Sequence, residues 1–289
     1  MKPSAFEYSR PDSLGAALDL LAEHGSQAKV LAGGQSLIPM LSMRLAAPAR
    51  LIDINRIAAL DYVRTGPAGV RVGALARHAV LERDGSAARC QPLLAAALAS
   101  VAHPTIRNRG TSVGSIVHAD PAAELPAVLS LLGGSLTVAS AAGQRVVPAA
   151  ELFVGPLESS LAPTELAIEA FFPALAQRSG VAFAELSRRR GDYAVCGVAV
   201  LVALDQDLRV SSALAGYLSI AATPLVLDLT GPIHGRTFDS DLAPAAALAR
   251  ELVDPEPDIH ATAEYRRQLV QVLTQRALRQ AARTAAGAD

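Results

Sequence analysis

The sequence predicts an α+β protein in two parts, the first with small β-α-β units and the second with an antiparallel sheet and helices. Three observations support this class. Short apolar runs alternate with amphipathic helical runs near the N-terminus. Strands in which apolar and polar residues alternate dominate from residue 165 to residue 229. Two helical runs follow, so we expect a boundary near residue 176, between parts 1–176 and 177–289.

The first 57 residues predict two helices and two strands. Apolar residues recur at helical spacing from Leu14, after a polar cap at Asp12 or Ser13, and Gly25 ends this helix. The next elements in order are a strand at 28–32, a helix at 37–45 and a strand at 50–54. This β-α-β unit lacks GxGxxG, which argues against the dinucleotide fold with that fingerprint. We expect it to form one subdomain, about 1–57, beside a second at 58–176.

The second subdomain begins with a predicted hairpin within residues 61–77, turning at Gly66 and Gly69. An Ala- and Leu-rich helix should end before Pro104, and the chain should then run as a loop to Asp120, which we expect to cap the helix begun by Pro121. The remaining elements predicted for this subdomain are a helix at 91–102, a helix at 121–132, strands at 135–140 and 144–147, a loop-rich link at 148–163 and a strand at 165–172.

The C-terminal part predicts an antiparallel meander closed by two helices. Its predicted strands are residues 181–186, 193–204, 208–215 and 220–229, and its predicted helices are residues 242–253 and 262–284. The last helix has an apolar face, and its arginines are expected to form a solvated face. The residues of that apolar face are Tyr265, Leu269, Val272, Leu273 and Ala277.

Composition excludes several classes of function. A net charge of −1 gives no electrostatic basis for binding nucleic acid or an acidic membrane. No signal peptide or long uncharged apolar run is present, so we expect a cytoplasmic protein without a membrane segment. Cys90 and Cys196 are isolated, and we expect both to be buried. Two thiols are too few for an iron–sulfur cluster, which takes four, and the histidines lack metal-ligand spacing, so no metal is predicted.

Two glycine-rich segments carry the candidate site. In the first, VLAGGQSL, Gly33 and Gly34 can adopt φ > 0 and present N–H groups to phosphate oxygens, and Ser36 adds a hydroxyl. In the second, RGTSVGSIVHADPAAELP, small and hydroxylic residues from Gly110 to Ser115 precede an acidic run. Either segment alone could be a simple turn. A pair of such segments can hold one diphosphate.

The two segments together resemble the flavin subunits of molybdenum hydroxylases, the medium subunits of the carbon monoxide dehydrogenase, quinoline oxidoreductase and xanthine dehydrogenase type. The likeness runs from FEYSRPDSL to AEYRRQLVQVL. It implies a two-part FAD-binding domain of the PCMH (vanillyl-alcohol-oxidase-like) type over residues 1–176. A C-terminal α/β domain of the carbon monoxide dehydrogenase flavoprotein type would follow over residues 177–289. It also implies noncovalent FAD, with the diphosphate between the two glycine segments.

The resemblance implies FAD-binding residues in both segments and in the walls around them, and no catalytic residue. Those of the first segment are Lys29, Val30, Leu31, Ala32, Gly33, Gly34, Gln35, Ser36 and Leu37. Those of the second segment and the run after it are Gly110, Thr111, Val113, Gly114, Ser115, His118, Ala123 and Glu124. Apolar wall positions are Ala102, Ile106 and Leu161, and Tyr193 in RRRGDYA supplies an aromatic face for the flavin.

The chain departs from the family pattern at three positions. Ser112 replaces an apolar residue, and Val113 replaces a glycine although a β-branched residue resists φ > 0. Glu185 stands where the family often has lysine, which removes a cationic contact to the flavin.

Several residues of this set have a second interpretation. His118 could be a catalytic base, but no nucleophile adjoins it, so a hydrogen bond to the cofactor or to its own loop is favoured. Glu124 could be only a first-turn acid of its helix, and with Asp120 it could mimic the paired acids of a hydrolase. Tyr193 could be an ordinary core tyrosine. The wall residues Ala102, Ile106 and Leu161 could be plain core.

The resemblance implies a subunit that performs only the FAD step of electron transfer. A large partner would carry the molybdenum cofactor and a small partner the [2Fe-2S] clusters, in a dimer of heterotrimers. Two alternatives remain, a stand-alone FAD-dependent reductase of the same superfamily and a non-enzymatic binding protein. The substrate of the complex (carbon monoxide, an N-heteroaromatic ring, an aldehyde or a thioester) and the electron acceptor stay open.

Overall fold

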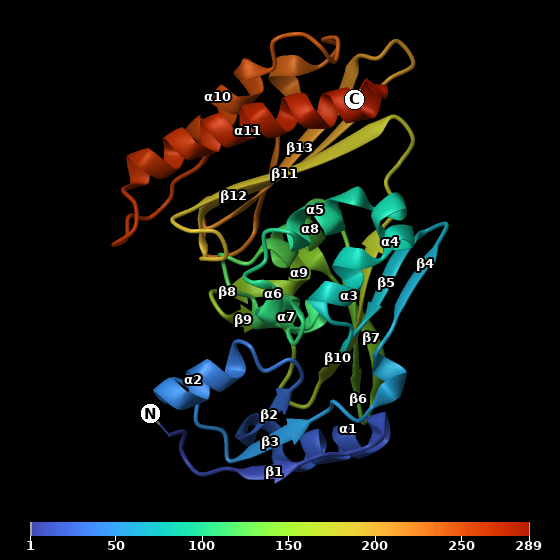
Figure 1. Cartoon of the computed structure of the whole chain (residues 1–289), viewed down its shortest axis with the longest axis vertical. Coiled ribbons are helices and arrows are strands. Elements are labelled where there is room, and N and C mark those ends of the chain that lie inside the picture. Colours follow the sequence, from blue (N-terminus) through green and yellow to red (C-terminus); the bar gives the residue numbers. More distant parts are fainter. Residues whose placement is uncertain (1, 289) are drawn as a thin grey trace.

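The N-terminal tier of the molecule is a small parallel sheet flanked by two helices (Figure 1). The structure is a computed structural model that describes residues 2–288. The strand order is β1-β3-β2, formed by β1 (Glu7–Ser9), β2 (Ala28–Leu31) and β3 (Arg50–Asp53), and the helices are α1 (Leu14–His24) and α2 (Leu37–Met43). The predicted β-α-β unit is confirmed, and β1 is a strand that the sequence pattern did not reveal.

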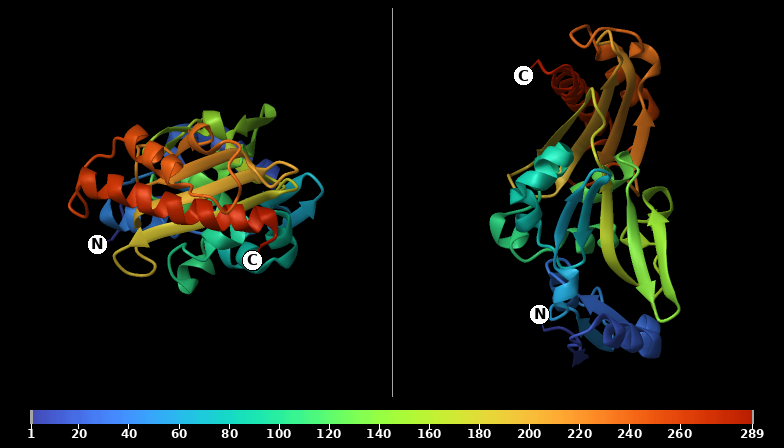
Figure 2. Two further views of the ribbon diagram at one scale, coloured as in Figure 1. Left: turned by 90° about the horizontal axis from the view of Figure 1, so that it is seen from above. Right: turned by 90° about the vertical axis from the view of Figure 1, so that its right-hand side faces the viewer.

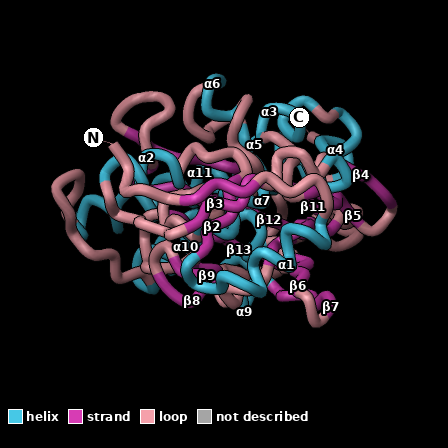
Figure 3. Tube along the Cα trace, turned by 90° about the horizontal axis from the view of Figure 1, so that it is seen from below, coloured by secondary structure: helices cyan, strands magenta, loops and turns pink. Residues whose placement is uncertain are grey.

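The first helix follows from its sequence. The Ser13 side chain accepts a hydrogen bond from the Ala16 backbone N–H at one end, and Gly25 ends the helix with φ +48°. The helix buries the side chains of its own Ala17 and Leu21. Seen from below, the N-terminal sheet lies across the middle of the molecule (Figure 3).

The middle tier is a five-stranded antiparallel sheet, in the order β4-β5-β10-β6-β7, with short helices around it. Its strands are β4 (Val63–Gly66), β5 (Gly69–Gly73), β6 (Ser135–Ser140), β7 (Gly143–Pro148) and β10 (Leu166–Pro173), and β8 (Phe153–Gly155) pairs with β9 (Glu158–Ser159). Its helices are α3 (His78–Arg83), α4 (Gly85–Cys90), α5 (Pro92–Leu98), α6 (Pro104–Arg107), α7 (Ser112–His118), α8 (Glu124–Leu131) and α9 (Ala149–Leu152). The predicted hairpin and strand pair are confirmed.

The segment from Pro104 to Asp120 is helical, so its prediction as a loop is wrong. The helices α6 and α7 occupy most of it, and the Thr111 side chain begins α7 by accepting the Gly114 N–H. Asp120 does not cap α8, because its carboxylate accepts from Ala122 and its carbonyl accepts from Ala123, which closes a turn before that helix. The helix therefore begins at Glu124 rather than at Pro121.

The C-terminal tier is the predicted antiparallel meander with its two helices. Its strands are β11 (Ser179–Ser187), β12 (Ala194–Leu204), β13 (Val210–Leu218) and β14 (Leu225–Asp228), and its helices are α10 (Ala243–Leu252) and α11 (Ala263–Ala286). The helix α11 crosses one face of the sheet, and the other face rests on α5 and α8 of the middle tier (Figure 2). The α+β class is confirmed.

Three expectations about individual side chains are wrong. The arginines of α11 do not all face solvent, since Arg266 is 6% exposed and donates to the carbonyls of Val195 and Ser219. Tyr265 is instead exposed. Cys196 is buried as expected, but Cys90 is only half-buried, at the end of a short helix.

Candidate functional site

A cavity of about 510 Å³ lies where the N-terminal and middle tiers meet the loop before β12. Its size is in the range of small-molecule and cofactor sites. Every residue of the predicted FAD-binding set lines it except Leu31, although the set is spread from residue 29 to residue 193. Further lining residues that the sequence did not single out are Met40, Ala46, Ile54, Ala74, His78, Val101, Val117, Leu157, Glu165, Leu166, Ala167, Gly191 and Asp192.

The two glycine segments are in direct contact at this cavity. A Cβ on Gly33 would lie 2.6 Å from the Arg109 carbonyl oxygen, 2.7 Å from the Gly110 Cα and 2.9 Å from the Thr111 nitrogen. Gly33 is thus required for close approach and not for a positive φ, whereas Gly34 has φ +73°. The bared backbone of one segment packs on the bared backbone of the other.

The second segment resolves the difficulty expected at Val113. This residue lies in the first turn of α7, is 2% exposed and needs no positive φ, so a β-branched side chain is compatible with its backbone. Gly110 meets the ring of His78, which a Cβ would approach to 2.8 Å. Burial, and then nearby Arg107, lower the pKa of His78 to about 4, so this ring is neutral near pH 7.

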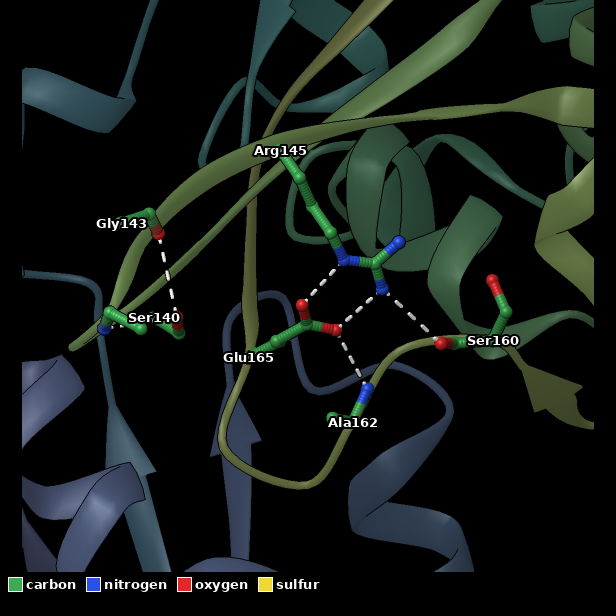
Figure 4. A network of polar contacts seen from close by, with 7 residues as sticks. Ser140, Gly143, Arg145, Ser160, Ala162 and Glu165 are labelled. Atoms are coloured by element: carbon green, nitrogen blue, oxygen red, sulfur yellow. Dashed lines mark hydrogen bonds and ion pairs between the residues drawn. The ribbon is translucent and has the colours of Figure 1, made fainter.

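Leu161 is brought to the cavity by a loop that an ion pair holds in place (Figure 4). The Arg145 guanidinium donates to both carboxylate oxygens of Glu165, at 2.6 and 2.7 Å, and the Ala162 N–H donates to the same carboxylate. These bonds, led by those from Arg145, lower the pKa of Glu165. The ion pair of Arg145 and Glu165, which the sequence does not predict, thus positions the predicted wall residue Leu161.

Tyr193 lies at the edge of the cavity and is 70% exposed, so it is not a core tyrosine. The loop before it passes close to His103, where Gly191 has φ +87° and a Cβ would lie 2.4 Å from the ring. Because Tyr193 is both exposed and part of the cavity lining, a planar ligand could stack on its ring.

Charges around the cavity are mixed. Lys29 is the one lysine or arginine among the described lining residues, and burial lowers the pKa of His118, which favours its neutral form. A doubly charged diphosphate would therefore depend mainly on backbone N–H groups. A neutral His118 can donate or accept a hydrogen bond but carries no charge to a ligand.

Two carboxyl groups, those of Glu124 and Glu185, lie near each other beside the cavity. Glu124 lies in the first turn of α8. Glu185 lies on the same face of β11 as Phe183, which packs against Ala127 of α8. One carboxylate oxygen of Glu185 is buried without a hydrogen-bond partner. Burial raises the pKa of Glu185 to about 7, and burial with the charges of Glu185 and Asp120 raises the pKa of Glu124 to about 8.

This carboxyl pair predicts a fall in stability as the pH rises. Both groups have a pKa in the folded state above their ordinary value of 4.5, so the folded protein binds more protons than the unfolded chain between about pH 5 and pH 8. Ionisation in that window destabilises the fold. Glu185→Gln, which mimics the protonated form, should raise the melting temperature at pH 8.5 by about 3 °C, roughly 1 kcal/mol after discounting for solvent screening.

The matched control is Glu251→Gln, at an exposed position of α10. It should change the melting temperature only slightly, and by the same amount at pH 4.5 and at pH 8.5. At pH 4.5 the Glu185 variant and the wild-type protein should melt together. A melting-temperature difference for Glu185→Gln that is the same at pH 4.5 and pH 8.5 would contradict the raised pKa of the buried Glu185 carboxyl.

The cavity fits the FAD that the family resemblance implies. It offers a glycine contact that a single Cβ would fill, bared backbone from two segments, an open aromatic ring and apolar walls. Among residues 2–288, no group of three or more His, Cys, Asp or Glu side chains is arranged to hold a metal ion. In the same part of the chain, no helix has the length and apolar character needed to cross a bilayer.

Comparison with known proteins gives two family matches, which together cover most of the chain. Residues 4–175 match the FAD binding domain in molybdopterin dehydrogenase, and residues 181–281 match the CO dehydrogenase flavoprotein C-terminal domain. The chain is similar to 6-hydroxypseudooxynicotine dehydrogenase complex subunit alpha from Paenarthrobacter nicotinovorans, with 42% identity over 97% of this chain and 96% of the relative.

Two further proteins resemble the whole chain. Caffeine dehydrogenase subunit beta from Pseudomonas sp. (strain CBB1) is 41% identical over 98% of this chain and 96% of the relative. The crystal structure of quinoline 2-oxidoreductase from Pseudomonas putida 86 superposes with a TM-score of 0.92 and 34% identity, and covers 99% of both chains. The chain therefore belongs to the FAD-binding medium subunits of the molybdenum hydroxylase family, and is the flavoprotein component of an oxidoreductase.

Proposed function

We propose that this chain takes electrons from an iron–sulfur subunit and passes them to an external acceptor through FAD held in the cavity. The observation that carries this proposal is the contact of Gly33 with the backbone of Arg109 to Thr111, which brings the two predicted halves of a diphosphate site together. Bound FAD supplies the redox chemistry. The residues of the predicted set are proposed to bind it without a covalent bond, and none of them is assigned a catalytic role.

The roles of the lining residues follow from their surroundings. The two glycine segments present backbone N–H groups to the diphosphate, and Thr111 fixes the start of α7 within the second segment by accepting the Gly114 N–H. Tyr193 covers a planar ring at the open edge of the cavity. Glu124 and His118 offer hydrogen-bonding groups whose charge near pH 7 is reduced by burial.

The proposed partners are a large subunit with the molybdenum cofactor and a small subunit with [2Fe-2S] clusters, assembled in the cytoplasm as a dimer of heterotrimers. Relatives whose names call them subunits of dehydrogenase complexes support a heteromeric assembly. The two cysteines of this chain are too few for a cluster of its own. We keep the proposed boundary between the two domains near residue 176.

We extend the proposal to the substrate of the large partner, which we take to be an N-heteroaromatic compound. The relatives named for 6-hydroxypseudooxynicotine, caffeine and quinoline each refer in their names to a compound with a nitrogen-containing ring. We place the determinants of this substrate in the large partner.

The experiment is purification of the chain, tagged, from cells that express its native partners. The expected result is a yellow preparation with a flavin spectrum that retains a large and a small subunit at fixed stoichiometry, and whose flavin is bleached by an N-heteroaromatic substrate. A colourless chain that ignores added FAD would contradict the FAD role. A yellow chain that never binds a partner and oxidises NADH or NADPH by itself would instead favour the stand-alone reductase.

A further inference from the structure

A hydrogen-bond network of Asn55 and Arg77 connects the two glycine segments, although neither residue lines the cavity. The Asn55 side-chain amide donates to the Ala32 carbonyl of the first glycine segment at 2.8 Å. The Arg77 guanidinium donates to the Asn55 side-chain oxygen at 2.6 Å and to the Arg109 carbonyl of the second segment at 2.6 Å. A continuous chain of three hydrogen bonds therefore joins the two segments.

Each member of this network has a fixed orientation. Asn55 uses its second amide N–H on the Asp53 carboxylate at 2.6 Å, and its backbone N–H donates to the same oxygen at 2.9 Å. The other oxygen of Asp53 accepts from the Tyr8 hydroxyl. With both N–H donors and the oxygen of Asn55 engaged, only one orientation of the amide satisfies its partners.

The second segment is also attached to Arg77 through its backbone. The His78 N–H donates to the Gly110 carbonyl, the Ser112 N–H donates to the Ala76 carbonyl, and Arg77 and Thr111 form an antiparallel bridge. A shift of Arg77 would thus move the start of α7. In the first segment, Ala32 immediately precedes Gly33, whose hydrogen atoms face that same backbone.

We propose that Asn55 and Arg77 are positioning residues that set the spacing of the two glycine segments and thereby the affinity for FAD. The inference rests on the FAD site of the proposed function and assigns that site two residues outside its lining. Neither residue touches the cavity, so they act through the backbone atoms they hold. The spacing matters because the Gly33 contact leaves no room for a closer approach, and a wider one would separate the N–H groups that share the diphosphate.

The test measures FAD dissociation constants of the apo-protein by quenching of FAD fluorescence. Asn55→Ala and Arg77→Ala should each weaken FAD binding about tenfold, the effect of losing hydrogen bonds to a charged group. The double variant should bind no more weakly than Arg77→Ala, because each single change already breaks the same connection. Arg71→Ala on β5, whose side chain pairs with Glu169 instead, is the matched control and should keep wild-type affinity.

A second measurement separates positioning from folding. Arg77→Gln can satisfy one acceptor but cannot span two, so it should keep the wild-type melting temperature while the amides of residues 33–36 and 110–114 exchange hydrogen faster in the apo-protein. Unchanged exchange and unchanged FAD affinity in Arg77→Gln, or additive effects in the double variant, would overturn the inference. Wild-type protein that binds no FAD would overturn the proposed function itself.

Discussion

Gly33→Ala is expected to abolish FAD retention through purification. The added Cβ would lie within 3 Å of three backbone atoms of the second glycine segment, which cannot rotate away as a flexible side chain could. Either the two segments separate or the backbone distorts, and overpacking of this kind corresponds to on the order of 100-fold in affinity. The measurement is the ratio of flavin to protein absorbance after gel filtration, followed by titration of the apo-protein with FAD.

The matched control is Gly15→Ala in α1, where a Cβ would meet nothing within 4 Å. That change should leave FAD binding unaltered and should slightly stabilise the protein, because alanine favours a helix over glycine. The same overpacking should lower the melting temperature of the Gly33 apo-protein by a few degrees without unfolding it, which far-UV circular dichroism checks. Full flavin occupancy in Gly33→Ala would show that the contact between the segments is not part of the FAD site.

The contact at Gly33 also shows which features of the site were accessible from the sequence. A glycine pair between a strand and a helix was visible in residues 28–45, and so was a second cluster of small residues near Gly110. The sequence suggests a positive φ as the role of Gly33, whereas the structure shows close packing against a segment more than 70 positions away, which leaves no local signal. At Val113 the sequence suggests a conflict between a β-branched side chain and a positive φ. The conflict does not arise, because Val113 lies in the helix α7.

Regular elements were predicted where a local periodicity decides the structure. The strand β10 and the first helix follow from patterns of 2 and 3.6 residues, whereas β12 is a nearly continuous apolar run buried at most positions. The segment from Pro104 to Asp120 has too few apolar residues for such a pattern, and its helices depend on the Thr111 cap and on tertiary contacts. The connection through Asn55 and Arg77 joins four segments and has no sequence signature of any kind.

Arg266→Leu is expected to lower the free energy of unfolding by about 3 kcal/mol, which corresponds to a fall of roughly 6–10 °C in melting temperature. The guanidinium is buried under α11 and donates to the carbonyls of Val195 and Ser219, with Asp258 as its counter-ion at 2.6 Å. Leucine would leave the buried Val195 carbonyl and the half-buried Ser219 carbonyl without these donors. Thermal denaturation of the variant measures the loss.

Arg276→Leu, on an exposed position of the same helix, is the control and should change stability by less than about 0.5 kcal/mol. If the two substitutions were equally mild, the buried guanidinium would not stabilise the C-terminal tier. Arg266→Lys separates charge from geometry, because an ammonium can pair with Asp258 but cannot span both carbonyls as a planar guanidinium does. We expect an intermediate loss from this variant.

Substitution of Arg266 should also change the environment of FAD in the proposed site. An ordinary stabilising residue would not have this effect. Ser219, whose carbonyl Arg266 holds, donates its N–H to the Pro121 carbonyl and its hydroxyl to the Ala194 carbonyl. Pro121 lies within the turn that leads to Glu124, and Ala194 follows Tyr193, so two walls of the cavity are linked to this backbone. Visible circular dichroism of bound flavin should therefore change in Arg266→Lys at saturating FAD and stay unchanged in Arg276→Leu.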